Sequence, residues 1–344
     1  MQKRIQYMDS LRAIAILGVL LLHAATPYVV LYGKIDPGDW QTGIVYNALS
    51  RWCVPIFLMI SGALLLGRKE EPLGDFFKKR ANKILLPFIV WSLVYYAWAT
   101  YMWNPGFSVK EFFILFFNNK VYYHLWYFYA LIGIYLLAPI FNVFINHASR
   151  QMVVYLVGLW ILFYGGFRYY SYLYSNDFTL FFPLSEYIGF FLLGYLLAKF
   201  EIEKKWRILI YLIGVIGAIE TIVRTNALTE AQGQFTSYAF SYSSPNVIAM
   251  SIALFVFFKY WVNHKVEKGT YQTSRLVMLI GQTSFGIYLI HAMVLDKVRP
   301  LFFEGNELFM KPLFAIPLQV LIVLVICTTV VWIIQKIPGL RKIV

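Results

Sequence analysis

Residues 10–24 read SLRAIAILGVLLLHA, an apolar run that is interrupted by two ionisable side chains, Arg12 and His23. In a helix the eleven steps between these residues cover about 16 Å and return to nearly the same face. Ionisable groups are costly in a lipid bilayer and normally face a cavity or one another. The stretch therefore predicts a membrane-spanning helix whose polar stripe points into a helical bundle.

The whole chain has the composition of a membrane protein. Of its 344 residues, 60% are hydrophobic and 14% are charged, whereas soluble proteins average about 45–50% and 25%. Apolar runs of about 20 residues recur throughout, and each could cross the hydrocarbon core of a bilayer. We expect a single domain over residues 1–344, an all-α polytopic bundle of about ten transmembrane helices. The predicted spans are residues 11–31, 44–66, 84–102, 124–145, 152–168, 180–199, 207–224, 246–262, 276–296 and 313–336.

The formal net charge of +13 reflects topology. About 20 of the 30 Lys and Arg residues lie at the two termini and in the even-numbered connections. By the positive-inside rule, we therefore expect both termini on the cytoplasmic side of the cell (plasma or inner) membrane. We therefore expect a lipid bilayer and no nucleic acid as partner. Lys3 and Arg4 precede a run that is too long for a typical signal peptide, so we expect an uncleaved first helix. Cys53 and Cys327 form no spacing that indicates a metal site or a disulfide framework.

Five ionisable residues from five predicted spans lie at a similar depth. His23 is joined in the outer third of the membrane by Arg51, His124, Glu186 and His291. Each residue alone has a structural explanation, such as a helix–helix hydrogen bond or a long side chain that reaches the headgroups. Their convergence on one level favours a functional site, in which Glu186 is a possible orienting carboxylate.

The other polar features have more than one interpretation. Asp9 is most simply the N-cap of the first helix and could pair with Arg12. The basic residues of the stretch FFKKRANKILLP (76–87) are explained by a position on the cytoplasmic side of the membrane. They could also bind a polyanionic ligand in the cytosol. Residues 225–245 form the longest external connection, and residues 108–117 could be a short interfacial helix.

Several blocks of the sequence resemble the acyltransferase 3 family, the integral-membrane acyltransferases that modify cell-surface glycans. MDSLRAIAILGVLLLH looks like the family's Arg–ten residues–His signature. The likeness covers essentially the whole chain and is closest to the single-domain enterobacterial common antigen O-acetyltransferase type. The other blocks that carry it are SRWCVPIFLMISG (50–62), FFKKRANKILLP (76–87), YYHLWYFYALIGIYLLAP (122–139), GFFLLGYLL (189–197) and SFGIYLIHA (284–292).

The resemblance implies ten helices, a cytosolic acyl-CoA co-substrate and no permanently bound cofactor. It implies that Arg12 and His23 are the family's essential pair. Arg51, His124 and His291 lie in blocks that look shared with the closest type, whereas Glu186 matches no residue that we can place there.

We therefore expect an O-acyltransferase that moves an acyl group, most simply acetyl, from acyl-CoA to a hydroxyl of a cell-surface or lipid-linked glycan. His23 would act as general base or as transient acyl carrier, and Arg51, His124 or His291 could stabilise the oxyanion. Ser61 and Gly62 would offer a small surface past which the pantetheine arm runs. The expected donor-binding residues are Arg12, Ser61, Lys78, Lys79, Arg80 and Lys83.

The alternative function is a transporter or flippase of a glycan or lipid-linked precursor, because intramembrane His and Arg residues also suit proton relays. Such a protein would be expected to have internal twofold symmetry and helices broken in matching halves. The sequence indicates neither. The acceptor glycan, the choice between acetyl and succinyl, and the oligomeric state stay open at this level.

Overall fold

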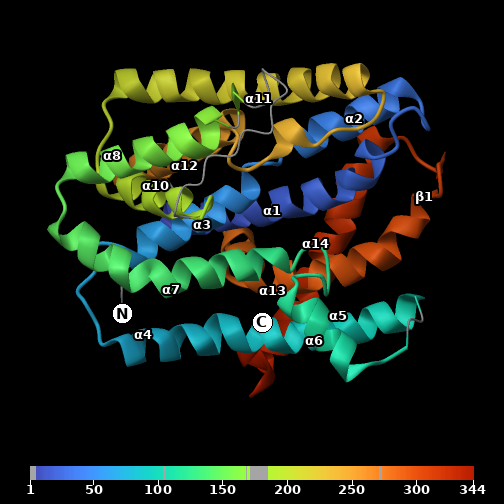
Figure 1. Cartoon of the computed structure of the whole chain (residues 1–344), viewed down its shortest axis with the longest axis horizontal. Helices are drawn as coiled ribbons and strands as arrows, with labels where there is room; N and C mark the ends of the chain where they lie inside the picture. The colour runs from blue at the N-terminus through green and yellow to red at the C-terminus, as the bar shows by residue number, and fades with distance from the viewer. Residues whose placement is uncertain (1–4, 104–105, 168, 171–184, 271–272) are drawn as a thin grey trace.

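The computed structural model describes residues 5–103, 106–167, 169–170, 185–270 and 273–344. Helices dominate this part of the chain (Figure 1). The elements are α1 (Gln6–Val29), α2 (Pro37–Ala48), α3 (Cys53–Leu65), α4 (Leu73–Arg80), η1 (Ala81–Leu85), α5 (Leu86–Trp103), α6 (Val109–Phe117), α7 (Trp126–His147), α8 (Arg150–Trp160), η2 (Ile161–Gly166), α10 (Ile188–Lys199), α11 (Lys204–Gln232), η3 (Tyr238–Phe240), α12 (Pro245–Glu267), α13 (Arg275–Val298), η4 (Arg299–Leu301), β1 (Phe303–Glu304), β2 (Glu307–Leu308), α14 (Pro312–Lys336) and η5 (Leu340–Lys342).

Eight helical segments of the described chain are long and apolar enough to cross a membrane. This finding confirms the predicted all-α polytopic membrane fold. The fifth and sixth predicted spans correspond to shorter apolar helices, Arg150–Gly166 and Ile188–Lys199. Residues 168 and 180–184 of those two predicted spans lie outside the described residues.

Helix α1 lies at the centre of the bundle, where it packs against α2, α3, α12, α13 and α14 (Figure 1). Its side chains Leu11, Ile16 and Leu20 are fully buried. The helix begins after Ile5, earlier than predicted, so Asp9 lies in the first turn and the prediction that it is the N-cap is wrong. The expected pairing of Asp9 with Arg12 is present, with 3.2 Å between Asp9 Oδ1 and Arg12 Nη1.

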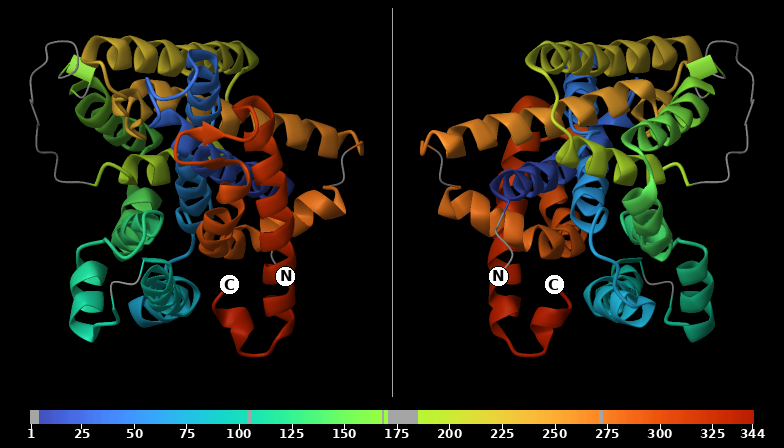
Figure 2. Two further views of the ribbon diagram at one scale, coloured as in Figure 1. Left: turned by 90° about the vertical axis from the view of Figure 1, so that its right-hand side faces the viewer. Right: turned by 90° about the vertical axis from the view of Figure 1, so that its left-hand side faces the viewer.

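The helices that flank this centre occupy opposite edges. Helix α11 packs along α12 at one edge, and α5 and α6 lie at the other (Figures 1 and 2). Helix α11 continues to Gln232, so the connection predicted over residues 225–245 is partly helical. The helix stops at Gly233, whose positive φ of 65° supplies the left-handed cap that ends many helices. Residues 109–117 form the short helix α6, as the sequence predicted.

The second predicted span is broken. The sequence suggested one helix over residues 44–66, but residues 49–52 form a turn between α2 and α3. Pro55 contributes to the break, because its ring lacks an N–H and crowds the carbonyl of the residue four positions earlier, which is Arg51. Proline is favoured in the first turn of a helix, where Pro55 lies in α3. Pro27, Pro139 and Pro317 lie inside continuous helices, so proline alone does not impose the break. The turn places Arg51 between two helices.

Helices α3 and α10 approach each other closely through glycines. A Cβ atom added at Gly62 would collide with the backbone of Phe191, and one added at Gly194 would collide with the backbone of Met59. Small residues allow this close approach of helices in membranes. Gly62 therefore faces α10, which corrects the expectation that its small surface lets a ligand pass.

Replacement of Gly194 by Ala should destabilise the protein, because the added methyl group meets backbone that cannot move aside. Overpacking of this kind costs about 1–3 kcal/mol. The measurement is the thermal unfolding midpoint of the purified protein in detergent. The matched control is Gly133→Ala in α7, where the added methyl group meets nothing within 4 Å. Equal midpoints for the two variants would contradict the close-packing explanation.

Candidate functional site

Three histidines from three separate segments form a contiguous cluster, here called the histidine cluster. His23 comes from α1, His124 from the turn before α7, and His291 from α13. The ring of His291 lies 5.1 Å from the ring of His23 and 5.1 Å from that of His124, measured between centroids. Three of the five residues that the sequence placed at one depth are therefore in contact.

His291 is fully buried, and its tautomer follows from its partner. Nδ1 lies 2.6 Å from the carbonyl oxygen of Tyr288. A carbonyl oxygen only accepts hydrogen bonds, so Nδ1 of His291 carries the proton and donates the hydrogen bond. In the neutral ring, Nε2 is then an acceptor, and no described residue bonds to it. His291 thus presents a basic nitrogen inside the cluster.

His124 is also buried, and neither of its ring nitrogens forms a hydrogen bond of good geometry with another described residue. Aromatic rings hold it in place: Tyr95 lies 4.6 Å away and Tyr288 lies 5.4 Å away, between centroids. The hydroxyl of Tyr288 donates to the backbone carbonyl of His124. The cluster therefore contains unsatisfied buried nitrogen atoms, which are rare in native proteins and often functional.

His23 is half-buried and has cationic neighbours. Arg51 and Arg299 both interact with it electrostatically, and no carboxylate of the described residues does so. The ring of Tyr123 lies 5.1 Å from that of His23, between centroids, and Tyr123 interacts in turn with Arg299. Two guanidinium groups thus act electrostatically on the imidazole, and positive charge of this kind suits an anionic reaction intermediate.

The turn between α2 and α3 fixes Arg51. Its Nε donates to Asn47 Oδ1 at 2.9 Å, and its guanidinium stacks on Phe240 at 4.2 Å from the ring centroid. Asn47 in turn donates to the carbonyl of Leu22 at 3.1 Å, directly beside His23 in the chain. The broken helix therefore ties Arg51 to the part of α1 that carries His23.

Glu186 contacts residues outside the histidine cluster. Its carboxylate accepts a hydrogen bond from Ser243 at 3.0 Å, and its backbone carbonyl accepts one from Trp160 at 2.8 Å. No interaction between Glu186 and the histidine cluster is present in the described part of the chain. The orienting role suggested for this carboxylate has no contact to support it.

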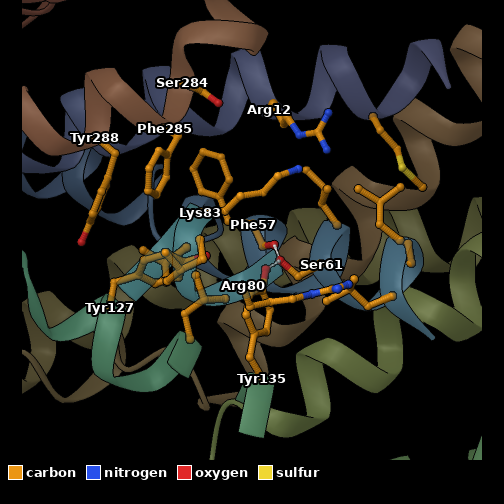
Figure 3. Close-up of a pocket in the computed structure, with 18 of the residues that line it drawn as sticks. Arg12, Phe57, Ser61, Arg80, Lys83, Tyr127, Tyr135, Ser284, Phe285 and Tyr288 are labelled. Atoms are coloured by element: carbon orange, nitrogen blue, oxygen red, sulfur yellow. Dashed lines mark hydrogen bonds between the residues drawn. The ribbon is translucent and has the colours of Figure 1, made fainter. Parts of the chain in front are cut away.

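A cavity of about 860 Å³ lies beside the cluster. Figure 3 shows Tyr288 and Phe285 at one end and Arg12 and Arg80 toward the other. Five cationic side chains line the cavity, against two acidic ones, so it favours an anionic ligand. The lining cations are Arg12, Arg68, Lys79, Arg80 and Lys83, and the acidic residues are Asp9 and Glu71.

Most of the predicted donor-binding residues meet in this cavity. Ser61 lines it and accepts a weak hydrogen bond from the Tyr135 hydroxyl at 3.4 Å, whereas Lys78 is exposed and does not line it. Glu71 bonds to Lys79 and Arg80, and the hydrogen bond from Lys79 is the main cause that lowers the pKa of the Glu71 carboxyl.

Tyr288 connects the cavity to the cluster. Its ring lines the cavity and also contacts His124 and His291, with 5.6 Å between its centroid and that of His291. None of the three histidines itself lines the cavity. The polar stripe of α1 thus leads from Arg12 along an open space that ends at the Tyr288 ring, with the imidazoles behind it.

Sequence reasoning missed three of these residues. Arg299 and Arg68 lie in connections between spans, where the sequence alone identifies them only as flanking cations. Tyr288 precedes His291 by three residues, a spacing that places both on one helix face and could have revealed their contact. No set of three His, Cys, Asp or Glu residues in the described chain is placed to hold a metal ion.

The arrangement suits group transfer to a nucleophile. A basic cavity can hold an anionic donor, an unprotonated imidazole nitrogen can accept a proton, and guanidinium groups can stabilise negative charge that develops on an oxygen atom. These three elements meet along one side of α1.

Comparison with known proteins identifies the same chemistry. A family model described as "Acyltransferase domain", of the acyltransferase 3 type, matches residues 5–336. No curated protein and no solved structure matches the chain significantly. Because the family model covers nearly the whole sequence, the chain belongs to this family of membrane acyltransferases.

Proposed function

We propose that this protein is an O-acyltransferase that moves an acyl group, most simply acetyl, from cytosolic acyl-CoA to a hydroxyl of a cell-surface or lipid-linked glycan. The observation that carries the proposal is the continuity of the site. A cavity lined by five cationic side chains ends at Tyr288, and the ring of Tyr288 contacts two of the three clustered histidines.

The basic cavity is the proposed donor site. Coenzyme A carries a 3′-phosphate and a diphosphate, which match the guanidinium and ammonium groups at the Arg12 end of the cavity. From the positive-inside rule we expect this end of the bundle at the cytoplasmic face, in a plasma or inner membrane. The pantetheine arm then runs past Ser61 toward Tyr288, and a turn of the Tyr288 ring admits the thioester to the cluster.

The histidine cluster is the proposed site of transfer. The acceptor hydroxyl attacks the thioester carbonyl carbon, a C–O bond forms and the C–S bond breaks. An imidazole takes the hydroxyl proton and gives it to the departing CoA sulfur. His23 is the proposed base because it is the half-buried member of the cluster and an acceptor can reach it. Transient acylation of its ring is the variant route.

Arg51 and Arg299 are the proposed oxyanion donors. Both act electrostatically on His23, and in the described part of the chain neither forms a salt bridge with a carboxylate. A guanidinium without an acidic partner remains available to the negative charge of the tetrahedral intermediate. The family match favours this enzyme over the transporter that the sequence left open.

Replacement of Arg12 by Ala should weaken donor binding, because a charge-assisted hydrogen bond in the cavity is lost. Such a bond is worth about 1.5–3 kcal/mol, which corresponds to a rise in the KM for acetyl-CoA of roughly tenfold or more. The kcat should change less. The control is Arg275→Ala, an equal change of charge at an exposed residue that does not line the cavity. An unchanged KM in the Arg12 variant would contradict the donor site.

Replacement of His23 by Ala should lower the transfer rate by about 10²–10⁴-fold, the usual contribution of a general base. Binding of CoA should persist, because His23 does not line the donor cavity. The assay offers radiolabelled acetyl-CoA and polysaccharide from the cell envelope to the purified protein in lipid nanodiscs, and measures label in the polysaccharide. Wild-type turnover in the variant would refute the assignment, and absence of label with the wild type would refute the proposed function.

A further inference from the structure

A line of aromatic rings leads from the surface of the protein to His23. We call Trp103, Tyr122 and Tyr123 the aromatic ladder. Trp103 stacks on Tyr122 with 6.1 Å between centroids and 25° between planes, and Tyr122 lies 5.2 Å from Tyr123. Tyr123 lies 5.1 Å from His23. Each ring thus contacts the next one, and the last contacts the proposed base.

The two end members of the ladder are accessible. Trp103 is 61% exposed and Tyr123 is 46% exposed, whereas Tyr122 between them is buried. Trp103 ends α5, and the two tyrosines lie in the turn before α7. Segments about 20 residues apart in the chain therefore combine into one series of contacting rings, which is exposed at its two ends.

A carboxylate holds the ladder in place. Asp296 near the end of α13 accepts hydrogen bonds through Oδ2 from Trp98 Nε1, at 2.9 Å, and from the Tyr122 hydroxyl. No hydrogen bond to Oδ1 of Asp296 from another described residue is present. The neighbouring Lys297 is exposed, and its Nζ lies 5.1 Å from the centroid of the Trp98 ring. Acceptor and donor groups thus border the aromatic surface.

This combination differs from an aromatic belt. Belt residues sit at the interface between membrane and water with an apolar ring in lipid and a polar tip in water. They need no contact with one another, with a carboxylate or with an imidazole. A pyranose ring, by contrast, offers a face of C–H groups that stacks on aromatic rings and a rim of hydroxyls that bonds to carboxylates. Aromatic rings beside Asp296 and Lys297 match both features.

We propose that the aromatic ladder and Asp296 form the acceptor subsite, in which pyranose units of a glycan stack on Trp103 and Tyr123 and present one hydroxyl to His23. This inference rests on the proposed transferase function and adds the ligand class and the residues that recognise it. Stacking on the rings brings the glycan hydroxyl within reach of His23, so that the acyl group is transferred to this hydroxyl rather than to water.

The test measures binding and turnover separately. The probe is the total polysaccharide released from envelopes of cells that lack this protein, and the wild type and variants are held in lipid nanodiscs. We expect Trp103→Ala and Tyr123→Ala each to weaken polysaccharide binding and to raise the KM for it by roughly 3- to 10-fold. The KM for acetyl-CoA should stay unchanged. Trp103→Phe, which keeps a ring, should retain most of the affinity.

The control is Trp206→Ala, because Trp206 is 53% exposed at the start of α11 and lies outside the ladder. Equal weakening in this variant would assign the effect to membrane anchoring and overturn the proposal. Wild-type affinity in both ladder variants, or absence of polysaccharide binding to the wild type, would overturn it as well. Loss of binding in the ladder variants without any acetyl transfer by the wild type would leave the subsite standing and refute the transferase function.

Discussion

The hydrocarbon core of a membrane offers no water to a charged or polar side chain, and this constraint orders the whole structure. Helix α1 carries Arg12 and His23, and it packs against five other helices. Both residues therefore face the interior of the bundle, where a cavity and two further imidazoles meet them. The rigid rise of one helix fixes their separation at about 16 Å.

Positive charge is in excess both in the cavity and around His23, and acidic residues offset part of it in the cavity. In the cavity, Glu71 pairs with Lys79 and Arg80, and Asp9 pairs with Arg12, yet cationic side chains remain in excess. The charged groups that act directly on His23 are the guanidinium groups of Arg51 and Arg299. An anionic donor at one end and a developing oxyanion at the other would meet the excess charge in each case.

The broken second span shows how irregular backbone serves such a site. Backbone that leaves a helix at membrane depth is tolerated where it is buried in protein. Here the turn over residues 49–52 lies between α2 and α3, and Asn47 bonds to the carbonyl of Leu22 in α1. Arg51 in this turn bonds to Asn47, so a chain of hydrogen bonds links it to the residue before His23. Pro55 in the first turn of α3 is compatible with the break, because its nitrogen has no hydrogen to donate to the carbonyl of Arg51.

The sequence by itself determined the class of the protein, because apolar runs of membrane-spanning length and the positions of the charges depend only on local composition. It also predicted a common depth for His23, Arg51, His124 and His291 from helical rise, and three of these residues are in contact. Residue spacing fixes which face of one helix a side chain occupies. It does not fix how two helices turn toward each other, and side-chain packing decides that rotation.

Only the tertiary structure decided which of these residues meet. It brought three histidines together, placed Glu186 with Ser243, left Lys78 outside the cavity and turned Gly62 toward α10. It also brought Arg299, which the sequence identified only as a cation flanking a span, close enough to act electrostatically on His23. The physical reason is that contacts between segments hundreds of residues apart depend on helix rotation and tilt, which the packing of the entire bundle sets at once.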